Sequence, residues 1–228
     1  MFGIGFGELD AIVRVMHGVS PDNAALIARF KYMQRLGFPE GVNSGRGVRS
    51  VYGIEETLKV LLAFELLETG ATPTRVIRMI RTGWIDLRQA LALGWFAARH
   101  EEVRSQRLML CAMPGAFREL GQEEDPQAKV AEPLRSMDLN QLVSWMTAAD
   151  QEIPNAAEQV RASNGPRRLV IDPMRLAAAL RALVPELTAM EAEDLDAAFA
   201  DFGSEAFNGA PEEAWSDLAR SRASTLGK

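Results

Sequence analysis

Cysteine and histidine are scarce in this sequence of 228 residues, which contains one cysteine and two histidines. A lone cysteine cannot form an internal disulfide, and a structural zinc site needs more cysteine and histidine ligands than the chain supplies. We therefore expect no metal and no other cofactor. Cys111 lies in an apolar run and is expected to be a small buried hydrophobe.

Long apolar runs are also missing. No stretch reaches the about 18 uncharged apolar residues that a membrane span requires. The N-terminus lacks a basic segment followed by an apolar one, so no secretory signal is expected. A Gly-Lys-Ser/Thr phosphate loop, a nucleophile elbow and a His/Asp pair are absent as well. These absences predict a cytoplasmic protein that neither enters a membrane nor acts as an enzyme.

The residues that are present favour helices. Aromatic residues make up 7% of the chain, and apolar residues as a whole make up 47%. That apolar content is enough for a core, and strong helix formers dominate the remainder. A mainly α protein of one or two domains is therefore expected.

Charge divides the chain into two unequal parts. Residues 1–100 hold 12 Lys+Arg against 9 Asp+Glu, whereas residues 101–228 hold 13 against 22. The balance is therefore +3 in the first part and -9 in the second. A surface that faces phosphate is expected in the first part, although a balance of +3 is also ordinary for a domain without such a surface. The acidic part is expected to face protein or solvent.

Hydrophobic periodicity predicts five helices before residue 105. They are expected at Glu8–Met16, at Ala24–Leu36, at Ile54–Thr69, from Thr72 onward, and at Asp86–Arg104. Gly18 is expected to end the first helix and Ser20 to cap the second. The last helix is either a dimerisation element or an ordinary core helix.

Beyond residue 105, short apolar runs alternate with helical segments. The runs at 107–112 and 168–172 predict two strands, which either pair in one small sheet or are unrelated. Helices are expected at 139–149, 173–183 and 191–202, a loop at 121–135, and a frayed tail from Gly203. Two short strands are too few for a stable sheet in a monomer. Their pairing across a two-fold axis would give a homodimer.

A basic and aromatic segment carries the strongest functional signal. The helix that ends before Gly37 presents four candidate DNA contacts, which are Arg29, Lys31, Tyr32 and Arg35. Cationic side chains on one helix can read base edges or bind phosphate, and a tyrosine can stack on the sugar-phosphate backbone. The alternative is that Tyr32 belongs to the core with Phe30 and that the charges are merely exposed.

A loop that contains glycine and arginine follows this helix. Glycines let the backbone approach a phosphate closely, and the guanidinium groups of Arg46 and Arg49 can bind it through two hydrogen bonds each. Tyr52 follows directly. The alternative is a solvated turn with incidental arginines.

The order of these motifs resembles the MerR superfamily of winged helix-turn-helix regulators, over about residues 8–82. The matching motifs are Gly18-Val-Ser-Pro21, Arg29-Phe-Lys-Tyr32, Arg35-Leu-Gly37, Gly45-Arg-Gly-Val-Arg49, Tyr52 and Gly70-Ala-Thr-Pro-Thr-Arg-Val-Ile77. The resemblance implies a second helix that enters the major groove and a wing that binds phosphate. It implies DNA contacts at Ser20, Arg46, Arg49 and Tyr52, besides the four residues of the second helix.

Together these features predict a mainly α fold with a winged helix-turn-helix N-terminal domain and a small α+β C-terminal region. The expected divisions are a DNA-binding domain at 1–84, a connecting or dimerisation helix at 85–104, an acidic interaction region at 105–205 and a flexible tail at 206–228. The predicted function is a sequence-specific transcriptional regulator of bacterial type, which binds double-stranded DNA as a homodimer and binds a protein partner through its acidic part. The alternative is a phage or mobile-element adaptor, excisionase-like or a packaging protein, that bends DNA without regulating transcription.

Overall fold

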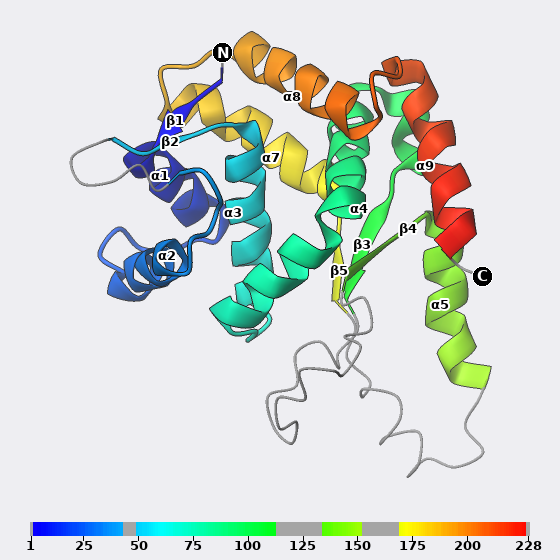
Figure 1. The fold of residues 1–228 in the computed structure, drawn as a ribbon, viewed down its shortest axis with the longest axis horizontal. Coiled ribbons are helices and arrows are strands. Elements are labelled where there is room, and N and C mark those ends of the chain that lie inside the picture. The colour runs from blue at the N-terminus through cyan, green and yellow to red at the C-terminus, as the bar shows by residue number, and fades with distance from the viewer. Residues whose placement is uncertain (1, 43–48, 113–133, 152–168, 227–228) are drawn as a thin grey trace.

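The computed structural model describes residues 2–42, 49–112, 134–151 and 169–226, and they form a mainly helical fold with small sheets. The elements follow in the order β1 (Ile4–Gly5), α1 (Phe6–Met16), α2 (Ala24–Arg35), β2 (Val51–Tyr52), α3 (Ile54–Leu67), α4 (Pro73–Arg99), a 3-10 helix η1 (Glu101–Gln106), β3 (Met109–Ala112), β4 (Leu134–Met137), α5 (Leu139–Gln151), β5 (Leu169–Ile171), α7 (Pro173–Leu187), α8 (Ala192–Ala206) and α9 (Glu212–Leu226). Helix α4 runs through the middle of the molecule, with α1 and α2 on one side and α5 and α9 on the other (Figure 1). None of the helices in the described ranges is long and apolar enough to cross a membrane.

The N-terminal helices are held together by a turn and a short antiparallel ribbon. Strand β1 pairs with β2, and Ile4 lies opposite Tyr52. Helix α2 begins at Ala24 because the side chain of Asn23 accepts hydrogen bonds from the backbone N–H groups of Ala25 and Leu26. The prediction that Ser20 caps this helix was wrong, since Asn23 lies at the first position from which a side chain can reach those amides.

Helix α4 is continuous over 27 residues, where the sequence had suggested two helices. Gly83 and the polar pair Arg81-Thr82 before it weaken the helical pattern locally, but Ile80 and Leu87 on either side are both buried in the core. Packing along the whole length therefore overrides the local propensity. The boundary expected after residue 84 falls inside this helix.

The C-terminal strands form one sheet within the chain. Its strand order is β4-β3-β5, and both neighbours run antiparallel to β3. The predicted strands therefore pair, with Leu110 opposite Ile171. Strand β4 was not predicted, and it gives the sheet three strands within one chain. The expectation that this part of the chain supplies two strands was therefore wrong.

The tail that was expected to fray contains helix α9, which is anchored by an aromatic side chain. Trp215 is 2% exposed, and its indole N–H donates to the carbonyl oxygen of Ala210 at 2.8 Å. A Cβ at Gly203 would lie 2.0 Å from the Trp215 ring, so a glycine is required there for α9 to pack on α8. The predicted boundary at residue 206 therefore does not mark the end of the packed structure.

The buried apolar residues form one continuous core. It includes Leu58 and Leu62 from α3, Leu93 from α4, Leu180 from α7 and Phe199 from α8. The approach of α4 to α7 depends on Gly94, where a Cβ would lie 2.6 Å from Pro173. Cys111 is buried as expected, and burial raises the pKa of its thiol to about 11.

Candidate nucleic-acid interface

Helix α2 has one buried face and one exposed basic face. The buried face consists of Leu26, Phe30 and Met33, which follow the helical repeat. Phe30 lies at 4.6 Å from Phe64 between ring centroids, so it belongs to the core. The opposite face is exposed and consists of Ala24, Ala25, Ala28, Arg29, Lys31, Tyr32 and Arg35. The four residues predicted on this helix therefore share one surface, and α2 contains no acidic residue.

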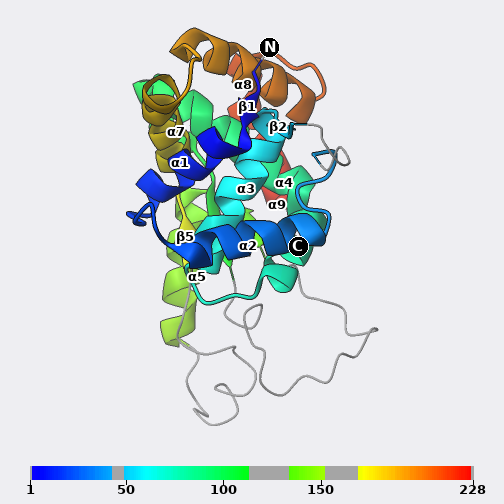
Figure 2. The ribbon, with the colours of Figure 1, turned by 90° about the vertical axis from the view of Figure 1, so that its left-hand side faces the viewer.

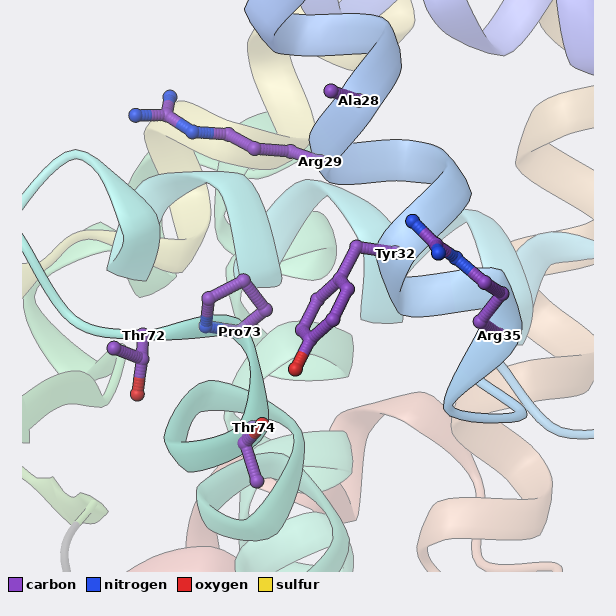
Figure 3. Close-up of a pocket in the computed structure, with 7 residues that line it drawn as sticks. All are labelled: Ala28, Arg29, Tyr32, Arg35, Thr72, Pro73 and Thr74. Carbon is purple, nitrogen blue, oxygen red and sulfur yellow. The ribbon is translucent and has the colours of Figure 1, made fainter.

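A groove of about 550 Å³ separates this surface from the start of α4. It is lined by Ala28, Arg29, Tyr32, Arg35, Thr72, Pro73 and Thr74, none of which is acidic. The ring of Tyr32 reaches from α2 toward Pro73 and Thr74, and the side chains of Arg29 and Arg35 leave the helix on either side of it (Figure 3). Helix α2 lies on the outside of the molecule, on the face that is turned toward the viewer in Figure 2.

The start of α4 adds positive potential to this groove. Thr72 is the N-terminal cap residue, and its side chain makes no capping hydrogen bond. Pro73 has no N–H group, and the first amides of a helix have no partner within the helix. A helix N-terminus carries a partial positive charge that favours anions. The groove therefore combines a helix N-terminus with two guanidinium groups.

The cations of α2 are only weakly engaged by other side chains. Arg29 is 3.5 Å from a carboxylate oxygen of Glu68, and both side chains are about half exposed. The guanidinium of Arg35 lies 5.6 Å from the centroid of the Tyr32 ring. Within the described ranges, Lys31 and Arg35 form no ion pair with a carboxylate. Their charges are therefore available to an anionic ligand.

The three arginines of α4 that recur at every third position have different environments. Arg81 binds Glu40 and donates to the carbonyl oxygen of Gly37 at 3.0 Å, so it fixes the end of α2. Burial alone would raise the pKa of Glu40, but hydrogen bonds from Arg81 and Lys59 hold that pKa below its ordinary value. Arg78 is exposed, whereas Arg75 is partly buried. Arg78 is therefore the arginine of this row that is best placed to face a ligand.

The wing predicted between α2 and β2 is described only at its end. Arg46 lies outside the described residues. Arg49 is exposed, and its guanidinium would lie 3.2 Å from a Cβ at Gly5, which places it over the start of α1. Arg49 does not line the groove between α2 and α4, so the structure does not join it to the other predicted contacts.

Tyr52 is a core residue, so its assignment as a DNA contact was wrong. Its side chain is 1% exposed, and its hydroxyl accepts a hydrogen bond from Nε2 of Gln34 at 3.0 Å. Burial raises the pKa of Tyr52. Its pairing with Ile4 in the β1–β2 ribbon explains the burial, and this pairing joins residues too far apart for a local pattern to reveal.

Ser20 lies exposed in the turn between α1 and α2. Its carbonyl oxygen accepts a hydrogen bond of 2.6 Å from the guanidinium of Arg14, so the turn is fixed through the backbone.

The sequence had not indicated Thr72 and Thr74 as site residues. The Thr-Pro-Thr sequence did mark a helix start, but nothing local placed that start beside α2.

No family model, curated protein or solved structure matches the chain. Among the described residues, no group of three or more His, Cys, Asp or Glu side chains could hold a metal ion. The groove between α2 and α4 is thus best characterised by its own chemistry. It suits a polyanion that presents phosphate groups to exposed cations and a helix N-terminus.

Proposed function

We propose that this protein binds double-stranded DNA through the exposed face of α2 and the adjoining groove at the start of α4. The observation that carries the proposal is the arrangement of Arg29, Lys31, Tyr32 and Arg35 on one face of α2, opposite the N-terminus of α4. Phosphates dominate the affinity of proteins for DNA, and helix N-termini and arginines are common phosphate ligands.

The shape of α2 supports insertion into the major groove. An α-helix with its side chains is about 10–12 Å wide, and the major groove is about 12 Å wide. The first half of the exposed face carries Ala24, Ala25 and Ala28, so the helix backbone can approach the base edges closely. The cationic second half then lies where it can reach guanine edges or flanking phosphates.

The biological role that fits this mode of binding is a sequence-specific transcriptional regulator with a winged helix-turn-helix. The order of the elements supports it, because α1 and α2 are joined by a turn and β2 leads into α3. In a homodimer, two copies of α2 would enter successive major grooves about 34 Å apart. A palindromic site is the expected target.

A test of the interface compares two triple variants in a salt titration with a labelled random DNA duplex. Arg29→Ala, Lys31→Ala and Arg35→Ala together remove the cations of α2. Arg104→Ala, Arg175→Ala and Arg181→Ala remove three exposed cations elsewhere and change the net charge equally. The first set should lower the salt slope by about 1 for each phosphate that the protein no longer neutralises, whereas the second should leave the slope unchanged. Equal slopes for both sets would contradict the proposal.

Sequence specificity needs a second measurement. Selection of a preferred duplex from a random pool, followed by single substitutions in α2, identifies any residue that reads a base. Removal of one bidentate arginine–guanine interaction should cost about 1–3 kcal/mol at one base position only. A pool that yields no preferred sequence would limit the function to DNA binding without regulation of particular genes.

A further inference from the structure

A second groove, of about 410 Å³, lies between the start of α3 and helix α8. Its apolar lining comes from Phe2, Ile54, Ala197, Ala198 and Phe202. Phe2 and Phe202 are buried by their neighbours, and the alanines leave space above α8. The groove therefore offers an apolar floor at the surface, and its lining comes from the N-terminal segment at Phe2, the start of α3, Arg88 of α4 and helix α8.

One stripe of α8 forms a wall of this groove. It consists of Asp194, Ala197, Ala198, Asp201 and Glu205, which recur at intervals of three and four residues and so share a face of the helix. The stripe is about 16 Å long at 1.5 Å per residue. Small side chains in its centre and carboxylates along its length suit a ligand that lies lengthwise on the helix.

The negative charge of this groove is only partly compensated. The guanidinium of Arg88 binds Glu205 and lies 3.7 Å from Glu55. Three further lining carboxylates, Glu56, Asp194 and Asp201, have no basic partner among the residues that the structure describes. Elsewhere on the same helix, Asp196 is compensated by Arg181 at 3.2 Å. Two carboxylates of α8 without a basic partner in the described ranges, Asp194 and Asp201, therefore face the groove.

Arg88 shows how a cation is accommodated here. Its guanidinium carbon lies 4.9 Å from the centroid of the Phe202 ring while its nitrogens contact carboxylates. A cationic side chain can thus place its charge at the rim and its aliphatic stem on the apolar floor. A lysine or arginine of a bound ligand would find the same apolar floor with carboxylates at its rim beside Asp194 and Asp201.

We propose that this groove docks a basic amphipathic segment of a partner protein. Charge complementarity selects the partner, because the carboxylates attract lysine and arginine and repel phosphate. The length of the stripe selects a peptide segment, since about 16 Å matches roughly three turns of a helix lying in a groove. The inference concerns a surface distinct from the DNA-binding face and does not depend on the proposed function.

The probe for this interaction is a synthetic helical peptide of leucine and lysine about four turns long, titrated into the full chain by calorimetry. Glu56→Gln, Asp194→Asn and Asp201→Asn together should weaken its binding about ten-fold. Glu102→Gln, Glu186→Gln and Glu213→Gln remove the same charge outside the groove and should leave the affinity nearly unchanged. Equal reductions in affinity for the two sets would mean attraction to net charge alone and would overturn the proposal.

A second pair of variants tests the apolar floor. Ala197 is exposed on α8, and arginine is a good helix former, so Ala197→Arg should fold and occupy the groove with its own cation. Peptide binding should then disappear, whereas Ala178→Arg on the exposed face of α7 should have no effect. Retained binding in Ala197→Arg would overturn the proposal. If spermidine bound as tightly as the peptide and the same variants abolished its binding, the groove would be a site for a small cation. That result would also overturn the proposal.

Discussion

Two grooves of similar size but opposite charge lie near the two ends of α3. The groove beside the start of α4 measures about 550 Å³ and is lined by arginine, tyrosine and threonine. The groove beside the start of α3 measures about 410 Å³ and is lined by five carboxylates and one arginine. The net charge of -6 describes neither groove, because it averages over a segregated surface. Local lining, rather than net charge, decides which ligand each groove suits.

A chain of alternating charges connects the two regions. Lys59 on α3 contacts Glu55 at 2.8 Å and Glu40 at 3.2 Å, and its side chain is 11% exposed. Glu55 lies beside Arg88 at the acidic groove, and Glu40 binds Arg81, which fixes the end of α2. The scaffold that separates the grooves is therefore itself held by partly buried ion pairs.

The largest effect on stability is expected when Lys59, the central charge of this row of ion pairs, is replaced. Lys59→Met would remove the buried cation that Glu40 and Glu55 share and leave these carboxylates with only Arg81 and Arg88 as partners. We expect a decrease of about 3 kcal/mol in the free energy of unfolding, the low end for a broken buried pair because both carboxylates are partly exposed. Urea denaturation measures it, and Lys59→Arg should recover most of the stability. A decrease below about 1 kcal/mol would show that these ion pairs do not hold the scaffold.

A smaller effect should distinguish the basic groove from the rest of α4. Thr74→Glu places a carboxylate at the start of the helix, where it should stabilise the protein by about 0.3–1 kcal/mol. The same carboxylate should weaken DNA binding about ten-fold, because it neutralises the helix N-terminus. Thr82→Glu lies on the exposed face of the same helix and is the control for both measurements. If Thr74→Glu raised both the stability and the affinity for DNA, the role given to the helix N-terminus would be contradicted.

The smallest effect concerns pH and belongs to the scaffold. The pKa of Glu40 is below its ordinary value of 4.5, so its contribution to stability is complete above that pH and disappears as the pH falls through the lowered pKa. Because Glu40 is 45% exposed, we expect less than about 1 kcal/mol. Glu40→Gln should therefore lower stability at neutral pH and match the parent protein in acid. A difference that persists unchanged in acid would assign the effect to packing.

The local pattern of the sequence was sufficient for several elements. Helix α2 begins and nearly ends where its periodicity predicts, and its exposed face contains the predicted basic residues. The runs around Leu110 and Val170 form strands because apolar β-forming residues bounded by breaks adopt that conformation. The residues that follow the helical repeat in the first part are largely buried, as Leu9 and Ile12 of α1 and Leu58 and Leu62 of α3 show, whereas Ile27 and Leu36 of the second predicted helix are only partly buried. In each of these cases the residues that carry the signal all lie within a single helix or strand.

The predictions from the sequence were wrong where contacts between distant residues outweighed the local pattern. The sequence suggested two helices where packing makes α4 continuous, and the polar tail concealed the anchor Trp215. Strand β4 was missed because its four residues have no clear alternation and pair with β3 only in the folded chain. Tyr52 looked like a wing residue but is buried by β1, which lies nearly 50 residues earlier.

In the helices that it predicted, the sequence by itself determined which side chains face outward, because helical periodicity is a property of neighbouring residues. It thereby determined that Arg29, Lys31, Tyr32 and Arg35 form one surface. Only the tertiary structure decided what lies opposite that surface, namely Thr72 and Thr74 at the start of α4. It also decided that α8 lies against the start of α3 and forms an acidic groove there. The physical reason is that such contacts depend on how helices pack around a shared core, and no local pattern encodes that packing.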